Sequence, residues 1–365
     1  MTGLLHCADL HLAADEKEYG FAVLREILEI AQDCNAVLFC GDLFDSYADL
    51  QKLQGEVVSL VEQILDSDCR VLFLPGNHER LRATKGAGLE TLAWGKIELL
   101  AQEPFSYVDL ADGDILAIPH QSSYSDYPTW VIPAKSGAWR IVMAHAAVAG
   151  MHYLGPDEEE SGSVIDADLF SHCGADYAAM GHIHKATVES KAQTKIVFPG
   201  SARVWRKHET GPRQVIKLEI QNGNIAHKEM QLKSAGQFRS IPATVETDGS
   251  IHLPDSMDFD PNDWLHFELY GITEEIQAMH DSQQAISQDL QARRVSFDEA
   301  NVQEMKNLRQ NAFARKFETV WRQKMQECQL DTGNDSQQYE ERREVLLRAR
   351  QLALQSIYSL SQDRS

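Results

Sequence analysis

The stretch LFCGDLFD, at residues 38–45, joins a short apolar run to a carboxylate through a single glycine. The apolar run ends at Cys40, the chain breaks at Gly41, and Asp42 follows at once. A buried strand that delivers one side chain to a site has this pattern. We therefore place Asp42 at the centre of the chemistry and work outward from it.

Four other apolar runs end in the same manner, in LLHCADLHL, VLFLPGNHE, IVMAHAAVAG and YAAMGHIH. In open sheets the carboxyl ends of the strands face the ligand crevice, so five such strands would bring their last side chains to one place. The polar side chains that follow the four runs are Asp9, His11, Asn77, His78, His145, His182 and His184.

Composition restricts the class of protein. The chain has 365 residues and a net charge of −21, which argues against broad binding of nucleic acid by a basic surface. Its six cysteines form no CxxC pair and sit mostly in apolar runs, as reduced thiols of a cytosolic protein do. No signal peptide and no run of membrane-spanning length is visible, so we expect a cytoplasmic protein without a membrane partner.

Alternating strand and helix patterns predict an α/β fold for residues 1–232. Apolar residues at helical spacing predict helices over residues 21–30 and 57–65, which make right-handed βαβ units and a parallel sheet. Short runs between residues 187 and 232 are expected to be antiparallel strands that close a second sheet.

Two smaller parts are expected after residue 232. Residues 233–295 contain one convincing strand, beginning at Trp264, among turn residues, and are interpreted as a small α+β cap. From residue 298 onward the chain has apolar stripes at helical spacing, so residues 296–365 are expected to form a helical hairpin. Its apolar side would pack on its own domain or on a partner.

The collected ligands indicate a centre of two divalent metal ions. Two carboxylates, one amide and four imidazoles can hold two ions that clamp the attacking and leaving oxygens of a phosphate ester. Asp42 has two oxygens and is the natural bridge between the ions. A mixed set of imidazole and carboxylate without cysteine favours Mn, Fe or Zn over Mg or Ca. His78 remains as the catalytic group that protonates the leaving oxygen or neutralises developing charge.

The motifs DLH at Asp9, GDLFD, GNHE, AH at His145 and GHIH resemble, in order and spacing, those of the calcineurin-like metallophosphoesterase family. More narrowly, GDLFD, DYAAMGHIH from Asp176 and PGS at Pro199 look like the SbcD branch. Members of that branch are bacterial double-strand-break nucleases that work with an SbcC-type ATPase.

The resemblance implies a four-layer fold of two β-sheets between helices, and a Mn-dependent exonuclease or endonuclease acting on DNA. Manganese is favoured, with Fe or Zn as alternatives. The resemblance further implies a cap that guides DNA and C-terminal helices that dock on the coiled coil of the ATPase, and it allows for a homodimer. One metal would be held by Asp9, His11, Asp42 and His184, and the other by Asp42, Asn77, His145 and His182, with His78 catalytic.

Three positions depart from this pattern or are open. Glu79 stands where the family most often has aspartate, and the longer acid should still support the ligands. Asp45 stands where archaeal and eukaryotic relatives carry histidine, and we interpret it as the N-cap of the following helix. Arg203 is a weak candidate for binding a substrate phosphate, and a surface salt bridge explains it equally well.

Three functions compete at this point. The first is a DNA nuclease, the hydrolytic subunit of an SbcC/SbcD-like repair complex. The second is a phosphodiesterase or phosphatase for a small molecule such as a cyclic nucleotide, for which the acidity needs no explanation. The third is a scaffold that kept the fold without turnover, which has no use for seven converging ligands.

Overall fold

The structure is a computed structural model in which the chain forms two compact units, Met1–Phe238 and Arg239–Ser365. It describes residues 1–66, 68–79, 88–121, 123–151, 164–207, 209–254 and 256–304, and between residues 313 and 354 the residues 313–314, 316–317, 319–321, 323–325, 345–346, 348–350 and 352–354.

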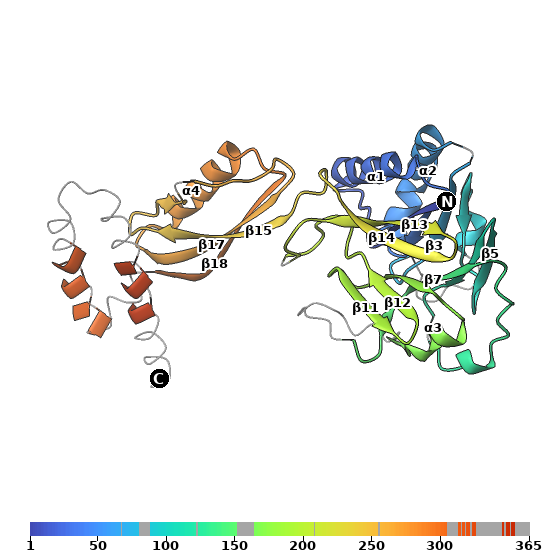
Figure 1. Ribbon diagram of the computed structural model, residues 1–365. Helices are drawn as coiled ribbons and strands as arrows, with labels where there is room; N and C mark the ends of the chain where they lie inside the picture. Colours follow the sequence, from blue (N-terminus) through green and yellow to red (C-terminus); the bar gives the residue numbers. More distant parts are fainter. Residues whose placement is uncertain are drawn as a thin grey trace. The chain divides into compact units, whose positions relative to one another are not determined.

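The first sheet of the first unit has the strand order β14-β13-β1-β2-β3-β4. Its core is parallel, because β1 pairs with β2, β2 with β3 and β3 with β4 in the same direction. Helices α1 (Lys17–Ala31) and α2 (Tyr47–Ile64) form the crossovers and lie side by side on this sheet (Figure 1). The strands are β1 (Thr2–Cys7), β2 (Ala36–Cys40), β3 (Arg70–Leu74), β4 (Ile97–Leu99), β13 (Gln214–Gln221) and β14 (Asn224–Gln231).

The second sheet has the order β11-β12-β10-β7-β6-β5, with β12, β10, β7 and β6 parallel and the two edge strands antiparallel. Its strands are β5 (Ser106–Leu110), β6 (Gly113–Ile118), β7 (Trp139–His145), β10 (Tyr177–Gly181), β11 (Thr187–Lys191) and β12 (Thr194–Phe198). The short elements of this unit are the helix α3 (Asp168–His172), the 3-10 turns η1 (Leu89–Thr91) and η2 (Tyr127–Thr129), and the strand pair β8 (Ala147–Val148) and β9 (Val164–Ile165).

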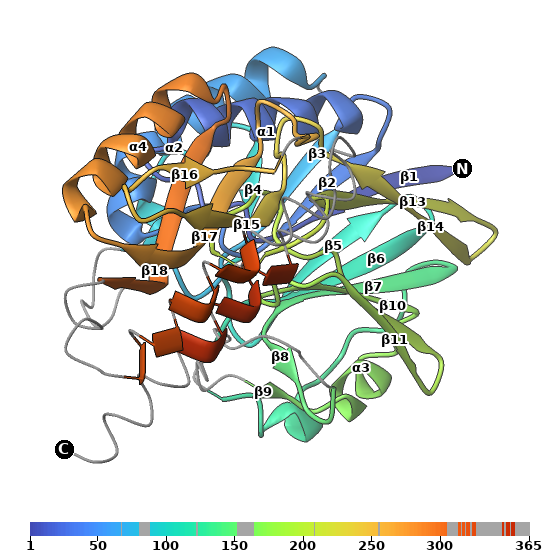
Figure 2. The same ribbon diagram turned by 90° about the vertical axis from the view of Figure 1, so that its left-hand side faces the viewer.

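Three apolar cores separate four layers in this unit. One core lies between α1, α2 and the first sheet, a second between the two sheets, and a third on the far face of the second sheet with α3. The alternation of strand side chains explains this, since Leu5 of β1 enters the first core and Leu4 the second. Figure 2 shows the two sheets one above the other, and the predicted four-layer α/β fold is confirmed.

One strand assignment was wrong. The hairpin of β13 and β14 was expected to close the second sheet, but β13 pairs antiparallel with β1 at the edge of the first. A period-two pattern predicts a strand but not the strand with which it pairs. Tertiary contacts determine the pairing of β13. Val215 enters the core below the helices while Leu218 enters the core between the sheets, so β13 is buried on both faces.

The second unit contains a four-stranded sheet in the order β16-β15-β17-β18, of which the sequence revealed only β17. Its elements are β15 (Phe238–Val245), β16 (Ile251–His252), β17 (Trp264–Thr273), α4 (Ile276–Asp289) and β18 (Arg294–Glu304). Residues 298–304 were expected to be helical, and this was wrong. They pair parallel with β17, where Val302 lies opposite Gly271. The edge strand β18 is mostly polar, so its sequence lacks the alternation of apolar and polar residues that would have predicted a strand.

Described parts of the C-terminal region are helical and pack on this sheet. Ala314, Phe317 and Leu354 surround Ile272 of β17. Trp321 donates from its indole nitrogen to the carbonyl of Leu346 at 3.1 Å, which joins the earlier stretch to the later one. The remainder of the predicted hairpin, residues 305–312, 326–344 and 355–365 among others, lies outside the described residues.

Two further expectations can be compared with the described part of the chain. Cys7, Cys34, Cys40, Cys69 and Cys173 are all buried and unpaired with one another, as predicted for reduced thiols. Among the described residues, no helix combines the length and the apolarity that crossing a bilayer requires.

Candidate metal centre

Five strand ends meet at one edge of the two packed sheets. β1, β2 and β3 belong to the first sheet, β7 and β10 to the second, and β2 contacts both β7 and β10 across the interface. The last residue of β7 and the loops that follow the other four strands carry all the predicted ligands. The position agrees with the rule that ligands bind outside the carboxyl ends of parallel strands.

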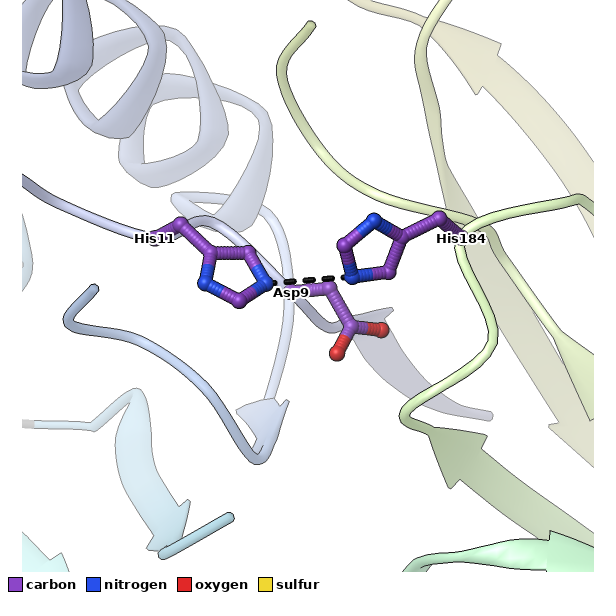
Figure 3. A group of neighbouring side chains, drawn as sticks. All are labelled: Asp9, His11 and His184. Atoms are coloured by element: carbon purple, nitrogen blue, oxygen red, sulfur yellow. Dashed lines mark hydrogen bonds between the residues drawn. The ribbon is translucent and has the colours of Figure 1, made fainter. Parts of the chain in front are cut away.

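The first ligand group consists of Asp9, His11 and His184, whose ligand atoms lie within 4.8 Å of one another. Figure 3 shows the two imidazole rings pointing at each other with the Asp9 carboxylate beside them. The two Nε2 atoms are 3.1 Å apart. Two imidazoles bound to one tetrahedral ion, with bonds of about 2.0–2.1 Å, would have nitrogens roughly 3.3 Å apart, so the observed spacing is close to that for a shared cation.

The second group consists of Asp42, His145 and His182, again within 4.8 Å. His145 Nε2 lies 3.2 Å from Asp42 Oδ2 and 3.0 Å from Asn77 Oδ1, and His182 Nδ1 lies 3.2 Å from the same Asn77 oxygen. Asp42 Oδ2 is also 4.0 Å from His11 Nε2 of the first group. The structure thus brings all seven predicted ligands together, and Asp42 lies between the two groups.

Hydrogen bonds orient two of the imidazoles. His145 donates from Nδ1 to the carbonyl of Cys40 at 2.9 Å, and His184 donates from Nδ1 to Glu209 Oε1 at 2.5 Å. Because these acceptors engage Nδ1, the Nε2 atom of each ring faces the centre. Metal-binding histidines are usually fixed in this way. The donor set therefore fits two divalent cations.

Backbone strain also marks the site. In the described chain, only six non-glycine residues have a positive φ, and four of these are Asp9 (54°), His11 (46°), Asp42 (48°) and His182 (89°). Such conformations cost of order 1–3 kcal/mol each and gather at functional sites, where the surroundings enforce them. The positive φ angles turn the backbone so that these four side chains lie in the ligand groups.

The motif glycines permit close approach between the loops. A Cβ at Gly41 would lie 1.9 Å from His145 Nδ1, and one at Gly76 would lie 2.1 Å from Asp42 Oδ1. Distances below 3 Å force something to move, so each motif needs glycine before its ligand for steric reasons.

Buried carboxyl groups give the centre its electrostatic character. Burial raises the pKa of Asp9 to about 6. Burial opposes ionisation of Asp42 too, but the neighbouring His145 and His11 hold its pKa well below the usual range. Burial and the charge of Asp42 raise the pKa of Glu79 to about 8. Divalent cations would balance the charges of Asp9 and Asp42 at neutral pH, whereas a pKa of about 8 leaves Glu79 mostly uncharged.

Glu79 supports the loops, as expected for the longer acid. It accepts hydrogen bonds from the backbone nitrogens of Asp42 (3.2 Å), Phe44 (2.8 Å) and Gly76 (2.8 Å). One buried side chain therefore ties the loop after β2 to the loop after β3.

His78 lies beside both ligand groups and is partly open to solvent, with 22% of its side chain exposed. Its Nδ1 donates to the carbonyl of Asp45 at 2.5 Å, and its Nε2 is 3.9 Å from Asp42 Oδ2. The backbone nitrogen of His78 donates to Asp42 Oδ1 at 3.0 Å. Nδ1 is thus engaged by the backbone, and Nε2 is the ring nitrogen that lies beside Asp42.

Two neighbouring residues differ from expectation. Arg203 forms the salt bridge that was one of its two interpretations, with Glu16 at 2.5 Å, but its guanidinium is buried instead of lying at the surface. It also donates to the carbonyls of Leu10 and His11. The N-cap of α2 is Ser46 in place of Asp45, because the Ser46 hydroxyl accepts from the Asp49 backbone nitrogen at 3.1 Å.

Two residues of the site were missed. Trp205 stacks on His11 with ring centroids 3.9 Å apart and an angle of 3° between the planes. Glu209 accepts from His184, as described above. Neither belongs to a metal-binding motif, and their only sequence signal is that they follow PGS closely.

Comparisons with known proteins agree with this geometry. The sequence profile described as calcineurin-like phosphoesterase matches residues 3–186. An uncharacterized metallophosphoesterase of Bacillus subtilis, YhaO, is 24% identical over 248 residues, which cover 61% of this chain and 59% of that protein. The DNA double-strand break repair protein Mre11 of Aeropyrum pernix is 23% identical over 286 residues, which cover 69% of this chain and 66% of that protein.

A second Mre11, from Methanopyrus kandleri, is 23% identical over 252 residues, covering 62% of this chain and 52% of that protein. The chain thus spans about half to two thirds of the length of these curated relatives. Among solved structures, a dimetal phosphatase from Danio rerio has a TM-score of 0.43 at 11% identity, covering 63% of this chain and 98% of that one.

Proposed function

Because this chain belongs to the calcineurin-like phosphoesterase family, we propose that it is a DNA nuclease that hydrolyses phosphodiester bonds with two divalent metal ions. The observation that carries the proposal is the convergence of two ligand groups on Asp42, with His78 open to solvent beside them. The similarity to two proteins described as Mre11 supports DNA as the substrate.

Asp9, His11 and His184 would hold one cation, Asn77, His145 and His182 the other, and Asp42 both. When bound, the cations supply Lewis acidity, a water of lowered pKa and charge neutralisation at the phosphate. The buried carboxylate of Asp42 would be the ligand that the two cations share. We propose Mn as the native metal, with Fe or Zn as alternatives, because the ligands combine imidazole and carboxylate without thiolate.

His78 acts on the leaving oxygen. Its Nδ1 is engaged by the carbonyl of Asp45, so only Nε2 can face the substrate. From that position Nε2 holds a proton and delivers it to the departing oxygen, or donates a hydrogen bond to the developing charge. The ring is partly exposed, so a substrate can approach it from solvent.

The acidity of the chain supports the existence of a partner. A net charge of −21 repels DNA, so a second subunit would supply the basic surface that phosphate binding needs. We propose an SbcC-like coiled-coil ATPase that docks on the C-terminal helices, with DNA guided by the small sheet domain. The nuclease would be the hydrolytic subunit of this DNA repair complex. Two copies of the chain could form a homodimer within the complex.

The test is hydrolysis of labelled linear DNA by the purified protein with Mn²⁺. Asp42→Ala, which removes the ligand proposed for both cations, and His78→Ala, which removes the acid–base group, should each lower the rate by at least about 100-fold. His252→Ala, at an exposed position of the second unit, is the control and should leave the rate unchanged. DNA that stays intact in the presence of the ATPase would contradict the proposal.

The acidity also favours a second candidate, a phosphodiesterase or phosphatase for a small phosphoester. The same two-metal centre would serve it, and no basic surface is required. Hydrolysis of a generic aryl phosphodiester and of cyclic nucleotides, with no cleavage of any DNA, would establish this alternative. The His78→Ala variant would lose activity in either case, so substrate choice is the discriminating observation.

A further inference from the structure

We propose that Trp205 and Glu209 are positioning residues for one metal position only, that of Asp9, His11 and His184. They would set the affinity of this position independently of the one that contains His145 and His182. The inference rests on the proposed two-metal function. It assigns to one of the two metal positions its own pair of positioning residues.

Glu209 is fixed at both of its carboxylate oxygens. Oε1 accepts from His184 Nδ1 at 2.5 Å, and Oε2 accepts from the backbone nitrogen of Trp205 at 2.7 Å. Only 9% of its side chain is exposed, so water competes little for these bonds. The carboxylate therefore holds the His184 ring in one rotation with Nε2 toward His11.

Trp205 fixes the other imidazole of the same group. Its ring is parallel to that of His11 at 3.9 Å, while the Arg206 guanidinium lies over the ring at 4.1 Å. The indole therefore has close contacts with both the His11 ring and the Arg206 guanidinium. The edge of His184 also contacts Trp205, with centroids 5.3 Å apart. The indole thus touches both imidazoles of this position.

The backbone beside these residues is anchored to the first ligand loop. Arg203 donates to the carbonyls of Leu10 and His11, and the backbone nitrogen of Val204 donates to the hydroxyl of Tyr19 in α1 at 3.0 Å. The loop that carries His11 and the segment that carries Trp205 and Glu209 therefore form one hydrogen-bonded body. A change in this segment is transmitted directly to His11 and His184.

The other metal position is oriented by different groups. His145 is held by the carbonyl of Cys40, and Asn77 contacts both His145 and His182. These contacts come from the last residue of β2 and from the loop after β3. Loss of the Glu209 carboxylate should therefore weaken one metal position and leave the other in place.

The test is calorimetric titration of the metal-free protein with Mn²⁺, which reads metal binding directly, without activity. The unaltered protein should bind two equivalents. Glu209→Gln should weaken one binding step by about 10–100-fold, the usual effect of removing an oriented partner of a metal-binding histidine, with the other step unchanged. Glu219→Gln, at an exposed position of β13, is the matched control and should bind both ions normally.

Trp205→Ala should weaken the same step, and Trp205→Phe, which keeps a stacking ring, should restore most of it. This pair leaves both oxygens of Glu209 in place, so it tests the inference if Glu209→Gln fails to fold. Equal weakening of both steps, or of neither, in folded variants would overturn it. Two ions bound with this selectivity but no hydrolysis of DNA would overturn the proposed nuclease and leave the inference intact.

Discussion

Single residues in this centre adopt conformations that the surrounding fold enforces. Asp42 combines a positive φ of 48° with complete burial, and either feature alone would be costly. The hydrogen bond from its backbone nitrogen to Glu79 holds the loop in place. Strain of this kind predicts that small changes close to the ligands have large effects.

Gly181→Ala tests this directly. A Cβ at Gly181 would lie 1.9 Å from the carbonyl oxygen of Cys40, which belongs to a buried strand and cannot move away. We expect Mn²⁺ binding to be lost and the free energy of unfolding, measured in urea, to fall by about 1–3 kcal/mol. Gly55→Ala is the control, since nothing lies within 4 Å of its added Cβ and α2 should gain up to about 1 kcal/mol. Normal metal binding by Gly181→Ala would show that the two loops can separate.

His6 predicts a pH dependence of stability. It is buried between the sheets, near Tyr177 Oη at 3.1 Å and the carbonyl of Met180 at 3.0 Å, and burial lowers its pKa to about 4. In the unfolded chain the His6 ring binds a proton as the pH falls through about 6.5, whereas in the folded chain it does so only near pH 4. Stability from the neutral ring is therefore present above pH 6.5 and is lost as the pH falls toward 4, by about 3 kcal/mol.

Urea unfolding of the unaltered protein and of His6→Gln at pH 7, 5.5 and 4.5 measures this effect. The difference in unfolding free energy between the two proteins should shrink as the pH falls, because only the unaltered protein loses the His6 contribution. A difference that stays constant over this range would mean that His6 is protonated in the fold.

Elements were predictable where local patterns determine them. The crossover helices and the five strands that end in motifs could be read from periodicity, because each is buried on one or both faces. The partner of β13 and the polar strand β18 could not, since pairing is decided by contacts far away in sequence. Trp205 and Glu209 were missed for the same reason.

The start of α2 supplies a prediction at this scale. Ser46 is the N-cap, and its hydroxyl accepts from the Asp49 backbone nitrogen at 3.1 Å. Ser46→Ala should lower the free energy of unfolding by about 1 kcal/mol, because a helix donor is left without its acceptor. Ser59→Ala, at an exposed position inside the same helix, should be neutral or slightly stabilising. Equal effects of the two substitutions in a thermal unfolding experiment would argue against the cap.

At the scale of the whole molecule, the ligand set is contained within the first unit, and the second unit has its own core. Of the described apolar residues in the C-terminal helices, Ala314 and Leu354 pack on β17, whereas Val320 is 52% exposed and Val345 is 68% exposed. Exposed apolar residues on a helical surface are common at docking sites, although single ones are also ordinary. The proposed ATPase interface makes these two residues the ones to change.

The double variant Val320→Asp with Val345→Asp should lose capture by the coiled-coil ATPase in a pull-down, because two carboxylates would have to be desolvated in the interface. Its thermal stability and its Mn²⁺-dependent hydrolysis without the ATPase should stay unchanged, since both positions are exposed and belong to the second unit. Val131→Asp, an 89% exposed position of the first unit, is the matched control and should be captured normally. Capture of the double variant at unaltered strength would place the docking surface elsewhere, while the two-metal chemistry of the first unit would stand.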